Sequence, residues 1–265
     1  AVACVVVDHY CLDARWEARL RAATGARIMA VDDIADRPHD CDLLLDQNLY
    51  ADMPGRYATL VPAACNALLG PHYTLLDRRF RQLRGDRARG EGAVRRLLVS
   101  FGGSDPPDLT SATLRALRGT GFAGLQVDVV LGSGNPHRDT VQRLCADMPA
   151  VHLHVQTARM AQLLAETDLV IGAGGVSAWE RCCMGVPSLS FAVADNQIGQ
   201  LHEMARSGLT CAPEPADDMV AAISLHLRAL MADPDLRGSL SRRSMEVVDG
   251  LGAPRVAQQL LSTAA

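Results

Sequence analysis

A glycine-rich turn followed by a carboxylate is the segment of this chain best suited to chemistry. It reads Ile171-Gly-Ala-Gly-Gly-Val-Ser-Ala-Trp-Glu180, an apolar strand that runs into glycines and then into a helix. The three glycines let backbone N–H groups approach an anion closely, and the helix that opens at Val176 points its positive dipole end to the same place. Glu180 can then accept hydrogen bonds from a sugar diol. An ordinary tight strand-to-helix turn is the alternative interpretation.

A second strand enters a glycine turn upstream, in Leu97-Leu-Val-Ser-Phe-Gly-Gly-Ser-Asp-Pro106. Ligands of doubly wound sheets bind beyond the carboxyl ends of the strands, where the strand order reverses, so both turns could face one anion. Neither turn fits the dinucleotide fingerprint G-x-G-x-x-G or the P-loop pattern G-x-x-x-x-G-K-[ST]. The two turns therefore predict a nucleoside diphosphate, UDP or TDP, held by backbone groups without a metal.

Three side chains near these turns have simpler roles. Asp105 and Asp108 flank two prolines ahead of a helix, and we expect both to cap that helix or to balance its dipole. Trp179 is expected in the core rather than against a ligand.

Composition excludes several other functions. The chain has 265 residues, 48% of them hydrophobic, and a net charge of −4 with scattered basic residues, which gives no basic groove for nucleic acid or membrane lipid. None of the 26 basic residues is Lys, so Schiff-base chemistry is excluded. The eight cysteines lack metal-ligand spacing and are predicted to be buried thiols. No leader or membrane-length apolar run is visible, so we expect a cytoplasmic location.

Short apolar runs alternate with amphipathic stretches, which is typical of a parallel α/β sheet. The predicted strands span residues 3–7, 27–31, 41–45, 97–101, 126–131, 151–155, 169–171 and 188–192. The predicted helices span residues 13–23, 109–117, 136–146, 160–165, 176–184, 197–207, 216–231, 234–248 and 254–261.

The pattern divides into two doubly wound α/β domains. Residues 1–84 form a partial N-terminal domain of about three strands, residues 85–94 a polar linker, and residues 95–265 a C-terminal nucleotide-binding domain of about six strands. Because a parallel sheet needs both faces covered, three strands with so few helices suggest that an N-terminal segment is missing.

Several segments in order along the chain resemble the UDP-sugar hydrolases of pseudaminic acid biosynthesis. They are Val5-Val-Val-Asp-His-Tyr10, Cys41-Asp-Leu-Leu-Leu-Asp-Gln-Asn48, Leu69-Gly-Pro-His-Tyr-Thr-Leu-Leu76, Leu98-Val-Ser-Phe-Gly-Gly-Ser-Asp105, residues 172–183 and Asp195-Asn-Gln197. That family has the GT-B fold and is similar in architecture to the lipid II glycosyltransferase. The resemblance thus implies two Rossmann-like domains, the first incomplete, with a cleft between them.

The resemblance also implies a mechanism, in which water attacks the anomeric carbon with inversion and UDP leaves. It assigns Tyr10 and Asn196 to the active site, Glu180 to the ribose, Ser104 to a phosphate, and the Val155 backbone to uracil. The family's histidine base lies in a G-x-G-H loop that this sequence lacks, and His9 is the substitute candidate, although a structural role suits a strand-end histidine better. Cys11 stands where the family has Gly, so the turn there is expected to differ.

The sequence therefore predicts metal-independent hydrolysis of UDP-2,4-diacetamido-2,4,6-trideoxy-β-L-altropyranose. The alternatives are a glycosyltransferase using the same UDP-sugar pocket, or a chain that binds UDP-sugar without turnover. We expect a UDP-sugar partner, no cofactor, no nucleic acid and no membrane, and a monomer is compatible with the sequence. The expected catalytic residues are Tyr10, Asn196 and His9. The expected substrate-binding residues are Gly103, Ser104, Val155, Gly174, Gly175, Val176, Glu180 and Gln197.

Overall fold

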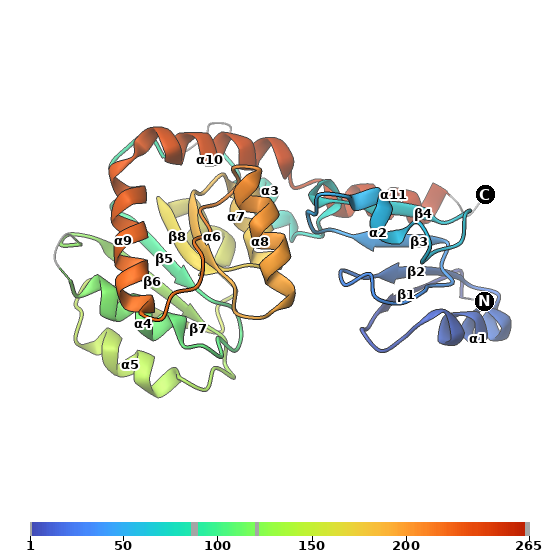
Figure 1. The fold of residues 1–265 in the computed structure, drawn as a ribbon, viewed down its shortest axis with the longest axis horizontal. Coiled ribbons are helices and arrows are strands. Elements are labelled where there is room, and N and C mark those ends of the chain that lie inside the picture. The colour runs from blue at the N-terminus through green and yellow to red at the C-terminus, as the bar shows by residue number, and fades with distance from the viewer. Residues whose placement is uncertain (1, 86–89, 120–121, 263–265) are drawn as a thin grey trace. The chain divides into compact units, whose positions relative to one another are not determined.

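The computed structural model describes residues 2–85, 90–119 and 122–262. The chain forms two compact units (Figure 1), which we call unit 1, residues 1–76 with 248–265, and unit 2, residues 77–247. Within the described residues no helix is long and apolar enough to cross a bilayer.

Unit 1 is built on a four-stranded parallel sheet in the order β1-β2-β3-β4. The strands are β1 (Cys4–Asp8), β2 (Arg27–Val31), β3 (Leu43–Asp46) and β4 (Asn66–Leu69). The predicted count of three strands was wrong because β4 has only four residues and begins with Asn, which is rare in strands.

Helices of unit 1 cover both faces of this sheet. They are α1 (Ala14–Thr24), α2 (Met53–Tyr57), the 3-10 helix η1 (Pro71–Tyr73) and α11 (Gly252–Ser262). Tyr57 of α2 packs with Ile28 and Leu44 in one core cluster. Val256 of α11 packs with Met29 and Leu45 in a second cluster. The C-terminal helix therefore completes unit 1.

Unit 2 contains a five-stranded parallel sheet in the order β7-β6-β5-β8-β9. The strands are β5 (Arg96–Ser100), β6 (Gln126–Leu131), β7 (Val151–Val155), β8 (Leu169–Ala173) and β9 (Ser188–Phe191). The predicted number of about six was one too many. The chain runs outward from β5 through β6 to β7 and then returns to the other side of β5, so the order reverses between β5 and β8.

Eight helices are described in unit 2. They are α3 (Arg78–Leu83), α4 (Leu109–Leu117), α5 (Arg138–Ala146), α6 (Met160–Glu166), α7 (Val176–Met184), α8 (Asn196–Arg206), α9 (Met219–Ala232) and α10 (Pro234–Val247). The core of unit 2 joins the apolar residues of β5, β6 and β8 to those of α4 and α9.

The predicted domain boundaries need correction at both ends of unit 2. Its first helix, α3, precedes the predicted linker, and the last helix of the chain, α11, lies in unit 1. A contiguous 95–265 domain was therefore wrong, because Val256 finds its apolar partners on the sheet of unit 1. Of the predicted linker, residues 86–89 lie outside the described residues. Beyond them, the Gly90 and Gly92 carbonyls accept hydrogen bonds from the buried Arg237.

Candidate functional site

Both glycine turns lie at the carboxyl ends of neighbouring strands. β5 and β8 are paired in parallel, with Ser100 opposite Gly172, so the turns that follow them emerge side by side. This is the point at which the strand order of unit 2 reverses. Open α/β sheets bind their ligands at that position.

The β8–α7 turn, residues 174–177, leaves the start of its helix open. Gly175 is the N-cap residue of α7 and has φ 74° and ψ −160°, a conformation essentially restricted to glycine. No side chain caps α7. The Gly174 N–H donates to the Phe191 carbonyl, so the N–H groups of Val176 and Ser177 are the ones left for an anion. Val176 is 46% exposed.

The glycines beside this turn also serve packing. Gly172 lies inside β8, and a Cβ atom there would sit 2.4 Å from the Ser100 carbonyl oxygen. A Cβ at Gly174 would sit 3.2 Å from the Cβ of Gln197. Gly172 and Gly174 therefore also serve the packing of the sheet and of α8, and the anion contact predicted for Gly174 stays a prediction.

The β5–α4 turn, residues 102–108, differs in its helix start. Asp105 is buried, and its carboxylate accepts hydrogen bonds from the N–H groups of Leu109 (3.0 Å) and Thr110 (2.9 Å) and from the Thr110 hydroxyl (2.7 Å). The predicted capping role of Asp105 is confirmed. Asp108 stands at the N-cap position without a side-chain cap bond, so capping by Asp108 was wrong. Gly103 and Ser104 are exposed at this turn.

Glu180 lies on α7, one turn beyond the open helix start. Burial raises the pKa of its carboxyl to about 7, and the Asp77 charge adds to this, while Arg181 opposes it. A half-buried carboxyl of this kind can accept hydrogen bonds from two hydroxyls. Trp179 is fully buried, which confirms its place in the core.

The start of α8 brings the predicted Gln197 amide to the β8–α7 turn. The Gln197 side chain lies against Gly174 and Gly175, 3.5 Å from where a Cβ of Gly175 would be. Its Oε1 accepts a hydrogen bond from the Val193 N–H (3.1 Å), which leaves the Nε2 donor for other contacts. Asn196 is exposed at the first position of α8.

The end of β7 carries the backbone predicted to read uracil. Val155 is the last residue of β7, and Gln156 after it adopts a left-handed backbone with φ 51°. Its side-chain Oε1 accepts a hydrogen bond from the Ser133 N–H (3.2 Å), which ties this bend to the end of β6. The strained residue thus lies directly beside the predicted base contact.

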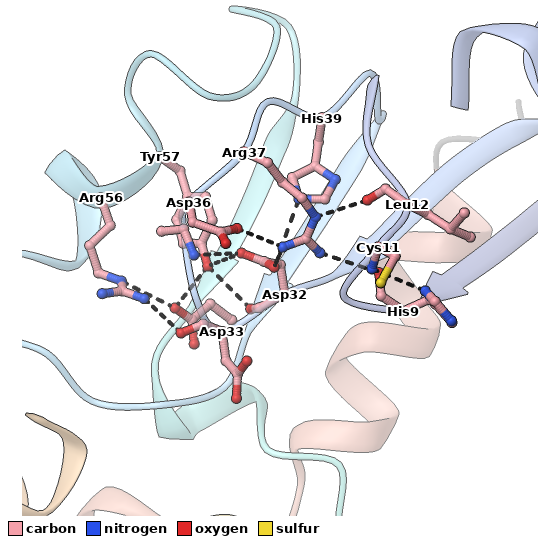
Figure 2. Close-up of polar contacts among 12 residues, drawn as sticks. His9, Cys11, Leu12, Asp32, Asp33, Asp36, Arg37, His39, Arg56 and Tyr57 are labelled. Carbon is pink, nitrogen blue, oxygen red and sulfur yellow. Dashed lines mark hydrogen bonds and ion pairs between the residues drawn. The ribbon is translucent and has the colours of Figure 1, made fainter. Parts of the chain in front are cut away.

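In unit 1, the predicted catalytic residues follow β1. Tyr10 is 57% exposed, and partial burial followed by the nearby Asp33 carboxylate raises the pKa of its phenol. His9 Nδ1 accepts a hydrogen bond from the Cys11 N–H (3.1 Å; Figure 2), so its neutral ring carries the proton on Nε2. That geometry favours the structural role for His9. Cys11 is exposed, unlike the buried thiol predicted, and needs no left-handed backbone.

Arg37 joins the turn after β1 to the loop after β2 (Figure 2). Its guanidinium donates to the His9 carbonyl (3.3 Å) and the Leu12 carbonyl (2.9 Å), and forms an ion pair with Asp32 (2.9 Å). Arg37 thereby fixes the backbone that carries Tyr10.

Beneath that loop lies a buried ionic group that no sequence pattern indicates. His39 Nδ1 lies 2.8 Å from a Glu17 oxygen, and Nε2 lies 3.9 Å from Asp32. Burial alone would lower the pKa of His39, but the two carboxylates outweigh it and raise that pKa to about 9. The Tyr57 hydroxyl lies 3.0 Å from Asp32. These residues come from separate segments, so only folding brings them together.

No family model matches the chain. It is 27% identical over 244 residues to the spore coat polysaccharide biosynthesis protein SpsG of Bacillus subtilis, covering 90% of this chain and 70% of that protein. It is 26% identical over 173 residues to the UDP-2,4-diacetamido-2,4,6-trideoxy-β-L-altropyranose hydrolase of Campylobacter jejuni, covering 65% of this chain and 60% of the hydrolase.

Solved structures share the fold over both units. The Acinetobacter baumannii MurG structure superposes with a TM-score of 0.64 at 14% identity, covering 98% of this chain and 74% of MurG. WaaG, a glycosyltransferase involved in lipopolysaccharide biosynthesis, gives a TM-score of 0.57 at 15% identity, covering 93% of this chain and 81% of WaaG. The predicted GT-B fold class, two α/β units with parallel sheets, is confirmed.

Proposed function

We propose that this chain is an enzyme that acts on a UDP-sugar. The observation that carries the proposal is the uncapped start of α7, which lies at the strand-order reversal with Glu180 one turn along the same helix. Main-chain N–H groups and the helix dipole suit a diphosphate, and the carboxyl suits a ribose diol. The C. jejuni relative is named for a UDP-sugar substrate.

The reaction we favour is hydrolysis of UDP-2,4-diacetamido-2,4,6-trideoxy-β-L-altropyranose to the free sugar and UDP. Water attacks the anomeric carbon with inversion, and the bond to the diphosphate oxygen breaks. The Val176 and Ser177 N–H groups then stabilise the charge that develops on the leaving UDP. Tyr10 of unit 1 and Asn196 of unit 2 remain the predicted active-site residues, whereas His9 is the weaker candidate because its Nδ1 is already an acceptor.

Calorimetry with UDP tests the binding part of this proposal. We expect UDP to bind and adenosine diphosphate to bind at least about tenfold more weakly, a difference of about 1.4 kcal/mol. No binding of UDP would contradict the proposed function.

An assay for UDP release separates hydrolysis from glycosyl transfer. Incubation of the chain with the diacetamido sugar nucleotide in water alone is expected to release UDP and free sugar. UDP formation only after an alcohol acceptor is added would favour a glycosyltransferase, which is the class of the structural neighbour WaaG. Binding of UDP without release over hours would favour a chain that binds UDP-sugar without turnover.

A further inference from the structure

A buried arginine lies directly behind the open start of α7. Arg181 is only 2% exposed, and its guanidinium points back toward the β8–α7 turn. Its Nη2 donates to the Ala173 carbonyl (2.7 Å) and the Ser190 hydroxyl (3.1 Å), and its Nη1 lies 3.4 Å from the Ser177 hydroxyl. The Nε atom is buried without a hydrogen-bond partner.

The charge of Arg181 has no counter-ion in contact. Among the described residues no carboxylate lies within 4.0 Å of its guanidinium, and all its hydrogen bonds go to neutral groups. Burial lowers its pKa to about 10, so the group remains charged at neutral pH. Glu180, the next residue, attracts this charge without touching the guanidinium, so the charge is only partly compensated, and a buried charge of that kind is costly.

Gly172 of β8 leaves room for the Arg181 guanidinium. A Cβ atom at Gly172 would sit 3.1 Å from Nη1 of Arg181, so any larger residue there would press on the guanidinium. Ser177, which lies beside Nη1, also contributes one of the two free N–H groups of the turn. The Arg181 guanidinium and the open start of α7 therefore meet at the same residue, Ser177.

We propose that Arg181 is a positioning residue of the phosphate site: its buried charge, placed behind the β8–α7 turn, makes the site select ligands by their phosphate charge. The inference rests on the proposed function, since it names a further determinant of UDP recognition. Arg181 does not touch the ligand. It holds the Ala173 carbonyl and the Ser177 side chain, and it adds a fixed positive potential that a bound diphosphate compensates.

The size of this effect follows from Coulomb attraction. If the guanidinium and a phosphate are taken to lie about 7 Å apart at an effective dielectric constant of about 20, one pair of unit charges gives roughly a fiftyfold change in affinity. Loss of the charge should therefore weaken UDP binding by about 10- to 50-fold and UMP binding by about 3- to 10-fold. Uridine, which has no phosphate, should change less than about twofold.

Calorimetric titration of the whole chain with uridine, UMP and UDP tests the proposal. Arg181→Gln keeps hydrogen-bonding groups and removes the charge, while Arg181→Met keeps the length without polar atoms. Arg237→Gln is the matched control, because Arg237 is equally buried but donates to the carbonyls of Leu230, Gly90 and Gly92. We expect the control to leave the UDP-to-uridine affinity ratio within about twofold of the wild type.

The outcomes distinguish the inference from the proposed function. If the wild type binds none of the three ligands, the proposed function fails. If it binds UDP, but Arg181→Gln weakens uridine and UDP equally, the charge has no role and the inference is overturned. Should neither Arg181 variant fold, the wild-type series decides: a gain of less than about tenfold from uridine to UDP would overturn the inference, and a larger gain would support it.

Discussion

The β5–α4 and β8–α7 turns resemble each other in sequence but differ in what holds the helix start. In the first, the Asp105 carboxylate occupies the N–H groups of Leu109 and Thr110. In the second, the N-cap is Gly175, and no side chain caps the helix. The two helix starts therefore differ in charge. The Asp105 carboxylate lies at the start of α4, whereas the positive end of the α7 dipole is uncapped and has the Arg181 guanidinium behind it.

The difference between the two turns shows that a glycine turn before a helix is not by itself an anion-binding site. A carboxylate from the chain can already satisfy the N–H groups and the helix dipole, as Asp105 does at α4. The β5–α4 turn can then contribute its exposed residues Gly102, Gly103 and Ser104 to a ligand. Recognition of the diphosphate is concentrated, in our proposal, on the β8–α7 turn.

The largest effect is expected from Gly175→Ala. A Cβ at this φ and ψ is strained, and relieving that strain must move the Val176 and Ser177 N–H groups. We expect UDP affinity to fall by about 3 kcal/mol, roughly 100-fold, in calorimetry. Gly103→Ala is the control, because no atom lies within 4 Å of its Cβ position, and it should change affinity less than about threefold. Equal losses at both glycines would contradict the contrast between the turns.

Removal of the Glu180 carboxyl should have the next largest effect. Glu180→Ala is expected to weaken UDP binding by about 1.5–3 kcal/mol, because hydrogen bonds to a charged group are lost. Comparison of UDP with 2′-deoxy-UDP locates those bonds: the wild type should prefer UDP, and the variant should lose the preference. An unchanged UDP affinity would show that the ribose assignment is wrong.

A smaller effect is expected from pH. Since the pKa of Glu180 is raised to about 7, its ionised form disfavours folding, and the free energy of unfolding should fall as pH rises from about 4.5 to about 7. Uridine affinity should rise about tenfold between about pH 6 and 8 as the carboxylate forms. Glu180→Gln should abolish this rise in calorimetry, and a rise that persists in the variant would implicate another group.

The smallest effect on binding is expected from Asp105→Ala. Loss of the α4 cap should lower the free energy of unfolding by about 1–2 kcal/mol, measured by urea denaturation. UDP affinity should stay within about threefold of the wild type, because Asp105 serves the fold. A tenfold loss of affinity with unchanged stability would reverse the roles assigned to the two turns.

Most elements of unit 2 could be predicted from the sequence. Strands β6 and β7 and helices α4 and α7 have the predicted bounds, because the two strands are rich in valine and leucine and the two helices are amphipathic stretches with glycine or proline near their ends. Three shorter elements were not predicted from the sequence. β4 has four residues, α2 has five and α3 has six, which is too few for a periodic hydrophobic pattern.

The candidate site was predictable only in part. Gly175 and Glu180 share one short segment, so their spacing shows what they can do together. Arg181 is adjacent to Glu180 in the sequence, but nothing local indicates that its guanidinium is buried with hydrogen bonds to neutral groups. Likewise Glu17, Asp32 and His39 lie in different segments and form an ionic group only after β1, β2 and α1 pack.

The sequence alone determined the parallel α/β class and the two glycine turns, because hydrophobic period and glycine position act through local backbone physics. Tertiary structure decided that β5 and β8 are neighbours, that the C-terminal helix completes unit 1, and that, of the two glycine turns, the second leaves its helix start without a side-chain cap. The first two facts depend on strand order and on apolar partners distant in the chain, and the contrast between the two turns depends on the Asp105 side chain folding back onto backbone N–H groups. None of these is encoded at a fixed spacing.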